Sequence, residues 1–211
     1  MQREHPGRSA EEAGTETGKE NAGRRERKST MKIKKIAAVC KARGCATIWD
    51  KTDSDGAMRQ WIATGASAYP VECLPYITEQ HLATLMDLSA KQAAEIAFKH
   101  TDASEKMCLD DVCDGEILCR EEPYSIVYGG RGINVYYAAG EAWFIDFSLL
   151  QPIVAEHDDM ELWLRKTADG AAYFAAKAGL LCVGIVLPLD HHENLADMLR
   201  STGEAYREHG I

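Results

Sequence analysis

The stretch of this sequence that is richest in reactive side chains is CLDDVCDGEILCREE, residues 108–122, in which three cysteines stand among six carboxylates. Paired thiolates bind zinc or form redox switches, and closely spaced carboxylates bind calcium. Without such a site, a segment of this composition is a charged surface. The spacing of the residues decides between these alternatives.

A calcium loop of the EF-hand type would run from Asp110 to Glu121. Five residues agree with that motif: Asp110, Asp114, Gly115, Ile117 and Glu121. Val112 removes a ligand at the third position, Leu118 stands at the ninth, and Pro123 opposes the exit helix that an EF-hand needs. The sequence therefore argues against a calcium site.

A zinc site would draw on the cysteines at C-x4-C and C-x4-C-x5-C spacing, namely Cys40, Cys45, Cys108, Cys113 and Cys119. Structural zinc sites usually have tighter C-x2-C pairs, and neighbouring carboxylates disfavour thiolates. The chain has seven cysteines, and in a reducing compartment we interpret them as buried thiols. We expect no metal and no cofactor.

Other catalytic signatures are weak. His191 and His192 precede Glu193, but a polar first turn of a helix that Asp190 caps explains them without chemistry. The glycines of YGGRGIN are typical of a hairpin turn, although an anion-binding nest remains an alternative. The sequence contains no phosphate loop, nucleophile elbow or H-E-x-x-H motif. It therefore favours a binding protein over an enzyme.

Several local patterns predict the elements of the N-terminal half. KIKKIAAVCKARG predicts a basic amphipathic helix, and CATIWDK and MRQWIAT flank an Asp55-Gly56 hairpin turn. A third strand over residues 67–72 is expected to be interrupted by Pro70. Two helices follow, one capped by Thr78 and one over residues 90–99 with a Ser89/Gln92 capping box.

The C-terminal half has a denser strand pattern. YSIVYGG, INVYYAAG and EAWFIDF predict three strands, followed by a helix SLLQPIVAEH that Ser148 caps. Three further strands are expected in MELWLRKT, AAYFAAK and LLCVGIVLPLD. The last predicted helix is amphipathic through Leu195, Met198, Leu199 and Tyr206.

This order predicts an α+β fold of mainly antiparallel hairpins with short flanking helices. We expect two small subdomains, residues 31–101 and 123–211, joined by an acidic loop or linker at 102–122. Residues 1–30 lack Leu, Ile, Val and aromatic residues and cannot order themselves by burial, and we expect Met31 to be the true start. The strand-rich half is loosely similar to sliding-clamp subdomains.

Charge and hydropathy restrict the class of partner. The 211 residues carry a net charge of −9, and residues 31–211 hold 17 basic against 27 acidic residues. Such a field opposes phosphate backbones and favours basic proteins, although it also serves solubility. The longest apolar stretch, residues 178–189, is shorter than the roughly 18 residues of a membrane span, and no secretory signal is evident. We expect a cytoplasmic protein.

Segments including GASAYPVECLPY, SIVYGGRGINV, FIDFSLLQPI and AAKAGLLCVGIVLPLD resemble a family of small prophage-encoded proteins, over roughly residues 31–190. The resemblance implies a mobile-element origin and a bacterial host cell. Such proteins often inhibit a host protein, and RNA-guided nucleases present a basic channel that an acidic domain can fill. The leading hypothesis is therefore a non-enzymatic inhibitor of anti-CRISPR type, perhaps directed against a type II nuclease.

The residues expected to contact this partner are mostly carboxylates, with Arg131 and an exposed tyrosine as an additional anchor. They are Asp102, Glu105, Asp110, Asp111, Asp114, Glu116, Glu121, Glu122, Arg131, Tyr137, Glu156, Asp158 and Asp159. One alternative is a clamp-like DNA-replication accessory protein that binds nucleic acid through Lys32, Lys34, Lys35, Lys41 and Arg43. A metal-dependent enzyme is the other alternative.

Overall fold

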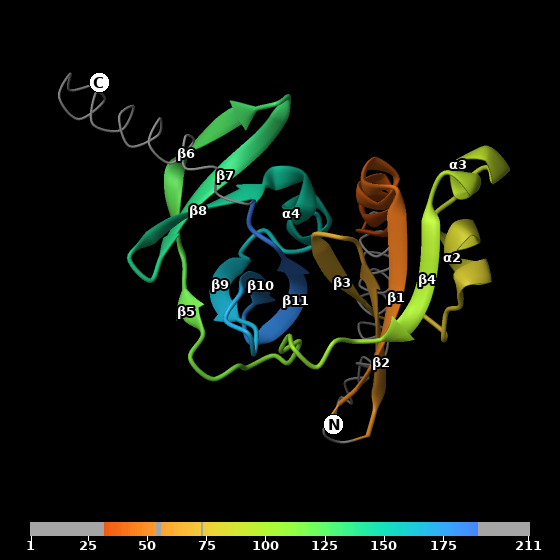
Figure 1. Ribbon diagram of the computed structural model, residues 1–211, viewed down its shortest axis with the longest axis horizontal. Helices are drawn as coiled ribbons and strands as arrows, with labels where there is room; N and C mark the ends of the chain where they lie inside the picture. Colours follow the sequence, from red (N-terminus) through yellow and green to blue (C-terminus); the bar gives the residue numbers. More distant parts are fainter. Residues whose placement is uncertain (1–31, 54–55, 73, 190–211) are drawn as a thin grey trace, which may run out of the picture.

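Two β-sheets organise the chain in the computed structural model, which describes residues 32–53, 56–72 and 74–189 (Figure 1). The larger sheet has eight strands in the order β4-β1-β2-β3-β11-β10-β9-β5, and the smaller has three in the order β6-β7-β8. All strand pairs are antiparallel except β1 with β4. The predicted α+β class is confirmed.

The strand bounds follow the chain order. They are β1 Cys45–Thr52, β2 Met58–Ala63, β3 Ser67–Val71, β4 Ala97–Asp102, β5 Ile117–Leu118, β6 Arg120–Tyr128, β7 Arg131–Ala138, β8 Glu141–Asp146, β9 Glu161–Lys166, β10 Ala172–Ala178 and β11 Leu181–Val186. The helices in the described ranges are residues 32–43, α2 Glu79–Leu85, α3 Ala90–Ala94 and α4 Phe147–Val154.

The larger sheet crosses from the first half of the chain to the second. β3 pairs with β11, with Ala68 opposite Ile185 and Ser67 opposite Val186. Residues 31–101 and 123–211, predicted as separate subdomains, therefore contribute strands to one sheet. The main core also joins the two sheets, because Ile62, Ile145 and Phe174 belong to the same buried cluster.

Several locally encoded features appear as predicted. β1 and β2 form the expected hairpin, and the amide of Gly56, at φ +81°, donates to the carbonyl of Asp53 at 2.9 Å. The Ser89/Gln92 capping box is present at the start of α3. Both features depend on groups within four residues of each other.

Other local predictions are wrong. Helix α3 ends at Ala94, and residues 97–102 form β4, because this segment pairs in parallel with β1. Pro70 lies inside β3 opposite Trp61 of β2, whereas the pairing of β3 with β11 stops at Ala68. The strand tolerates a proline there because it has a neighbour on one side only.

Helix α4 is capped differently from the expectation. Asp146, not Ser148, is the N-cap residue, and its Oδ1 accepts from the Ser148 amide at 3.0 Å. Thr78 does precede α2, but its hydroxyl contacts His81 Nδ1 at 3.2 Å and caps no amide. In both cases a competing side-chain contact decides the cap.

Some expectations fall outside the described residues. These are the unstructured segment 1–30, the start at Met31, and the final helix with His191 and His192. Among the helices that are described, none combines the length and the apolar character needed to cross a membrane.

Gly184 on β11 tests the packing of α4 on the larger sheet. A Cβ at this position would lie 2.4 Å from Ile153 Cδ1 and 2.9 Å from its Cγ1, and Ile153 is fully buried. We expect Gly184→Ala to lower the free energy of unfolding by about 1 to 3 kcal/mol in urea denaturation.

The control is Gly65→Ala, whose Cβ meets nothing within 4 Å and which we expect to be nearly neutral. Adding Ile153→Val to Gly184→Ala removes the clashing methyl group and should recover part of the loss. Strictly additive effects of the two substitutions would contradict the proposed contact.

Candidate binding surface

A buried arginine organises the acidic segment. The Arg165 side chain on β9 is fully buried, and its Nη1 donates to the carbonyls of Cys108 at 3.0 Å and Asp110 at 2.8 Å. Its Nη2 reaches the Asp111 carbonyl at 3.3 Å, and Nε and Nη2 bind Glu116 Oε2 at 2.9 and 2.6 Å. The guanidinium thereby donates hydrogen bonds to four residues of the segment 108–116.

Further contacts attach this segment to the larger sheet. Lys177 Nζ on β10 binds Glu116 Oε1 at 2.6 Å and lies 4.8 Å from the centroid of the Trp163 ring. The Tyr173 hydroxyl bonds both backbone groups of Cys108, and Asp111 Oδ1 accepts from the Cys182 amide at 2.9 Å. Residues 108–116 are therefore an ordered layer on β9–β11.

The predicted partner contacts separate into two groups. Glu116, Asp111 and Glu156 are used internally, the last in an ion pair with Lys32 at 3.2 Å. Asp110 is exposed and pairs with Lys51. The other predicted carboxylates that are exposed to solvent are Asp102, Glu105, Asp114, Glu121, Asp158 and Asp159.

The carboxyl group of Glu116 is stabilised as the anion. Burial raises its pKa, but hydrogen bonds from Lys177 and Arg165 and the charges of both residues outweigh this effect, so the pKa lies below its ordinary value. Glu116 is therefore charged at neutral pH despite its burial and holds two cations in place.

The structure offers no support for the metal alternatives. In the part of the chain that is described, no three His, Cys, Asp or Glu side chains are grouped to hold an ion. The segment leads into β5 and β6, not into the exit helix of an EF-hand. Burial raises the pKa of Cys40 to about 12 and that of Cys119 to about 11, which keeps these thiols protonated at neutral pH.

The predicted basic helix presents fewer free cations than expected. Lys32 is buried in its pair with Glu156, and Arg43 Nη2 lies 3.4 Å from Asp146 Oδ2. Lys34 and Lys41 are exposed, and Lys35 is half-buried. Two of the five residues proposed to bind nucleic acid are thus committed to ion pairs within the fold.

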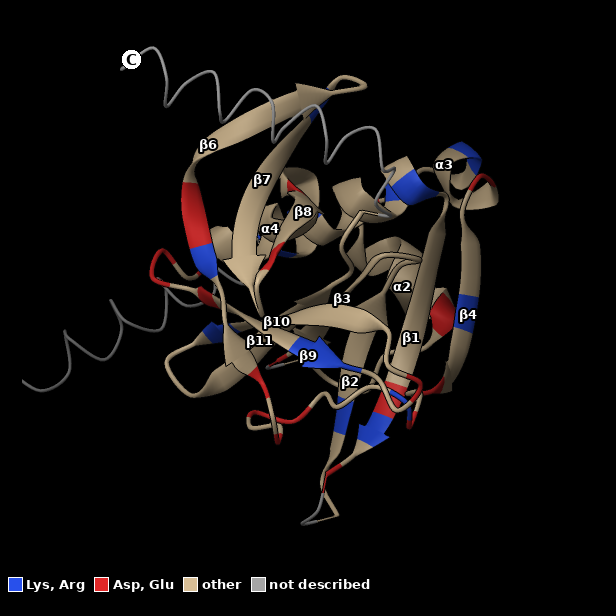
Figure 2. Ribbon diagram, turned by 60° about the vertical axis from the view of Figure 1, so that its left-hand side comes forward, with Lys and Arg blue, Asp and Glu red and all other residues tan. Residues whose placement is uncertain are grey.

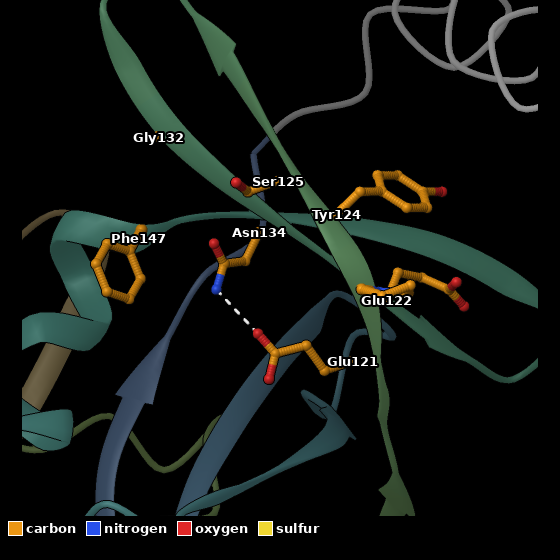
Figure 3. Close-up of a pocket in the computed structure, with 8 residues that line it drawn as sticks. Glu121, Glu122, Tyr124, Ser125, Gly132, Asn134 and Phe147 are labelled. Atoms are coloured by element: carbon orange, nitrogen blue, oxygen red, sulfur yellow. Dashed lines mark hydrogen bonds between the residues drawn. The ribbon is translucent and has the colours of Figure 1, made fainter. Parts of the chain in front are cut away.

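The β6–β7 hairpin carries an exposed surface that the structure brings together. Val127 is 79% exposed and stands opposite Gly132 in the register, and Tyr124 is 52% exposed. Gly132 and Tyr124 both line an open cavity of about 630 Å³. Glu121, Glu122, Tyr124 and Phe147 are among its lining residues (Figure 3). We call Glu121, Glu122, Tyr124, Val127 and Phe147 the hairpin surface.

Local contacts position the carboxylates of this surface. Glu121 Oε1 accepts from Asn134 Nδ2 at 3.1 Å, as Figure 3 shows, and from the Tyr136 hydroxyl at 3.4 Å. Glu122 pairs with Arg120 at 2.7 Å, so that acidic and basic residues adjoin at the start of β6 (Figure 2). The pairing of β6 with β7 is irregular between Glu121 and Ser125, and the residues of this irregular stretch line the cavity.

The remaining predicted contacts lie elsewhere on the hairpin. Tyr137 is 43% exposed, donates to the Gly140 carbonyl at 3.0 Å and has the Arg120 guanidinium carbon 5.6 Å from its ring centroid. Arg131 is exposed and lies 3.8 Å from Asp146. By the alternation of β7, both residues lie on the face opposite Asn134 and the cavity.

A polar cluster that sequence reasoning missed joins four distant segments. Asp50 Oδ2 contacts the Tyr76 hydroxyl at 2.6 Å and His100 Nε2 at 2.9 Å, and its Oδ1 accepts from Gln60 Nε2 at 2.8 Å. Burial raises the pKa of Asp50, but the hydrogen bonds from Tyr76, Gln60 and His100 outweigh this effect. The pKa of Asp50 therefore lies below its ordinary value. No spacing in the sequence could have signalled this grouping.

The cluster has a structural role. Gln60 also bonds the amide and carbonyl of Ile77, at 2.7 and 3.0 Å, which holds the chain before α2 against β2. Within the described part of the chain, the hydrogen-bond partners of the Asp50 and His100 side chains are Gln60, Tyr76 and each other, and none of these is a serine, threonine or cysteine nucleophile. The cluster therefore gives no reason to assign a reaction.

Comparisons with family models, with curated proteins and with solved structures gave no match to this chain. The functional argument therefore rests on the surfaces described above.

Replacing Arg165 tests the ordering of the acidic segment. Arg165→Gln removes one of the two cations on Glu116 and the arginine donors of three carbonyls, of which the Cys108 carbonyl keeps the Tyr173 hydroxyl. We expect the free energy of unfolding to fall by about 3 to 5 kcal/mol. Limited proteolysis should then cut first within residues 102–116. Arg120→Gln, which breaks an exposed pair, should cost less than about 1 kcal/mol; equal losses in both variants would refute this role of Arg165.

The pKa of Glu116 gives a dependence of stability on pH. Because the pKa is lowered on folding, the stabilisation is complete above the ordinary value of 4.5 and is lost as the pH falls through the folded value. Urea midpoints measured from pH 7 to pH 3 should fall more steeply below pH 4.5 for the natural chain than for Glu116→Gln. Parallel curves would mean that Glu116 contributes nothing to the acid sensitivity.

Proposed function

We propose that this chain is a non-enzymatic binding protein that engages a basic surface of a partner protein through the hairpin surface. The observation that carries the proposal is the exposure on β6 of Tyr124, which lines the cavity together with Glu121, and of Val127, which stands opposite the cavity-lining Gly132. Large apolar side chains exposed next to charged groups are typical of protein interfaces, and tyrosine is a frequent energetic anchor.

The electrostatics support a basic partner. The net charge of −9 attracts cationic surfaces over the whole molecule, which raises the rate of association. Close to the interface, Glu121 offers a carboxylate to Lys or Arg side chains that enter the cavity, whereas Glu122 points to the other side of β6, where it pairs with Arg120. The solvent-facing carboxylates Asp102, Glu105 and Asp114 extend the negative surface beyond the hairpin.

The resemblance to prophage-encoded proteins directs the choice of partner. We propose a host RNA-guided nuclease of type II, in the bacterial cytoplasm, whose basic nucleic-acid channel the hairpin surface would enter. Inhibition would then result from occupation of the channel, without any chemical step. The free carboxylates would take the place of the phosphates that the channel normally binds.

Cleavage of target DNA by a guide-loaded type II nuclease tests this function. We expect the purified chain to protect the DNA, and Val127→Lys to weaken inhibition at least tenfold, because it places a cation against the basic channel. Leu180→Lys is the matched control, since Leu180 is also 79% exposed but lies on the turn before β11. It should inhibit like the natural chain.

Two results would contradict the proposal in different ways. Absence of both complex formation and protection would reject this nuclease as the partner. Equal inhibition by Val127→Lys and Leu180→Lys would place the contact away from the hairpin surface, even if the nuclease is inhibited.

A further inference from the structure

Strand β6 lies at the edge of the three-stranded sheet and has one free side. Among the described strands it pairs only with β7, and it runs along the rim of the molecule in Figure 2. It is nine residues long, and all of its residues except Glu122 and Ile126 are exposed. An edge of this length is a template on which another chain can add a strand.

The turn after β6 fixes which backbone groups face the free side. The two glycines of residues 129–130 have φ of +58° and +77°, which is typical of a two-residue type I′ turn between the paired residues Tyr128 and Arg131. In such a hairpin every second pair, starting next to the turn, shares its hydrogen bonds. The amides and carbonyls of Val127 and Ser125 therefore point away from β7. Among the described residues, no hydrogen bond to these four groups is present.

Only the first half of this edge carries the features that prevent strand addition. Proteins usually protect an exposed edge with charges, prolines or bulges. Pro123 has no amide to donate, and the register is irregular between Glu121 and Ser125. Residues 125–128, Ser-Ile-Val-Tyr, pair regularly with β7 and contain no charge, proline or bulge. We call residues 125–128 the β6 edge.

The charge next to the β6 edge favours a basic occupant. Glu121 accepts hydrogen bonds from Asn134 and Tyr136 through Oε1, and within the described residues Oε2 has no partner, so that this oxygen is open to a cation. A strand added antiparallel to β6 would bring its C-terminal residues past this carboxylate. The net charge of −9 also repels a second copy of this chain. An extended segment of a basic protein therefore suits the edge better than a second copy does.

We propose that the β6 edge receives an extended segment of the basic partner as a fourth strand of the smaller sheet. Ser125 and Val127 supply two amides and two carbonyls at the two-residue spacing that an adjacent strand needs. Main-chain hydrogen bonds give the affinity, and a Lys or Arg of the segment that reaches Glu121 gives the specificity. This inference rests on the proposed function, because it assigns how the partner that meets the hairpin surface is held.

A synthetic peptide tests the edge without the nuclease. We expect the peptide Lys-Val-Thr-Val-Lys-Lys to shift the amide resonances of Ser125 and Val127 in the full chain, because these amides gain acceptors. The amides of alternate residues of a strand face the same neighbour. Methylation of one alternate set of peptide amides should therefore weaken binding about tenfold or more, whereas methylation of the other set should have a much smaller effect.

Substitution of Ser125 supplies a matched pair of variants. Ser125→Pro removes an outward amide without removing a bond to β7, and it should weaken binding of both the peptide and the guide-loaded nuclease about tenfold or more. Ser125→Ala loses the same hydroxyl but keeps the amide, and it should bind within about threefold of the natural chain. Unchanged hydrogen exchange of the amides in residues 131–138 would report an intact β6–β7 hairpin.

Failure of this inference differs from failure of the proposed function. Resonances of Ser125 and Val127 that do not move with the peptide, or equal weakening by both methylated sets, would overturn strand addition. Equal binding of the nuclease by Ser125→Pro and Ser125→Ala would overturn it too, while leaving the nuclease as the partner. Strand addition by the peptide without any complex with the nuclease would reject the nuclease alone. A dimer in light scattering whose formation shifts the same two resonances would identify a second copy as the occupant and overturn the proposal.

Discussion

The buried ion pair between Arg165 and Glu116 is the constraint on which the arrangement of the acidic half of this molecule depends. An arginine taken out of water is costly unless every donor finds an acceptor. The larger sheet cannot supply those acceptors, because its own carbonyls are used between strands. The chain from Cys108 to Glu116 supplies them instead, with three backbone carbonyls and one carboxylate. An apparently unstructured acidic linker thus becomes a layer of the fold, and Lys177 neutralises the second carboxylate oxygen.

This use of charge changes how the acidic composition should be interpreted. A negative net charge does not measure the charge available to a partner, because part of it balances buried cations. Glu116 and Glu156 are engaged with Arg165, Lys177 and Lys32, and these pairs would have to break before either glutamate could contact another protein. The carboxylates free for recognition lie at the margins of the ordered layer and on β6. Basic residues are divided in the same way, which leaves the helix of residues 32–43 with a smaller cationic face than its sequence indicates.

The three-stranded sheet separates two tasks by the alternation of its strands. One side of β7 contributes Tyr136 to the core and, further along, Asn134 to the cavity, where Glu121 is held in position. The other side carries Ile133 and Val135, which pack with Phe144 of β8 in a separate buried cluster.

The sequence by itself determined what short-range interactions control. Alternating apolar residues with turn glycines predicted the hairpins, the Ser89/Gln92 capping box was evident from its spacing, and Glu121 and Glu122 were expected to contact a partner. Only the tertiary structure decided the rest. Residues 97–102 became a strand because β1 offered an edge, and Pro70 was accommodated where β3 has one neighbour. The partners of Arg165 lie about fifty residues away, and the cavity is lined by residues of β6, β7 and α4 that meet only in the folded chain. Local patterns constrain neighbours a few residues apart, whereas burial energies depend on which distant surfaces meet.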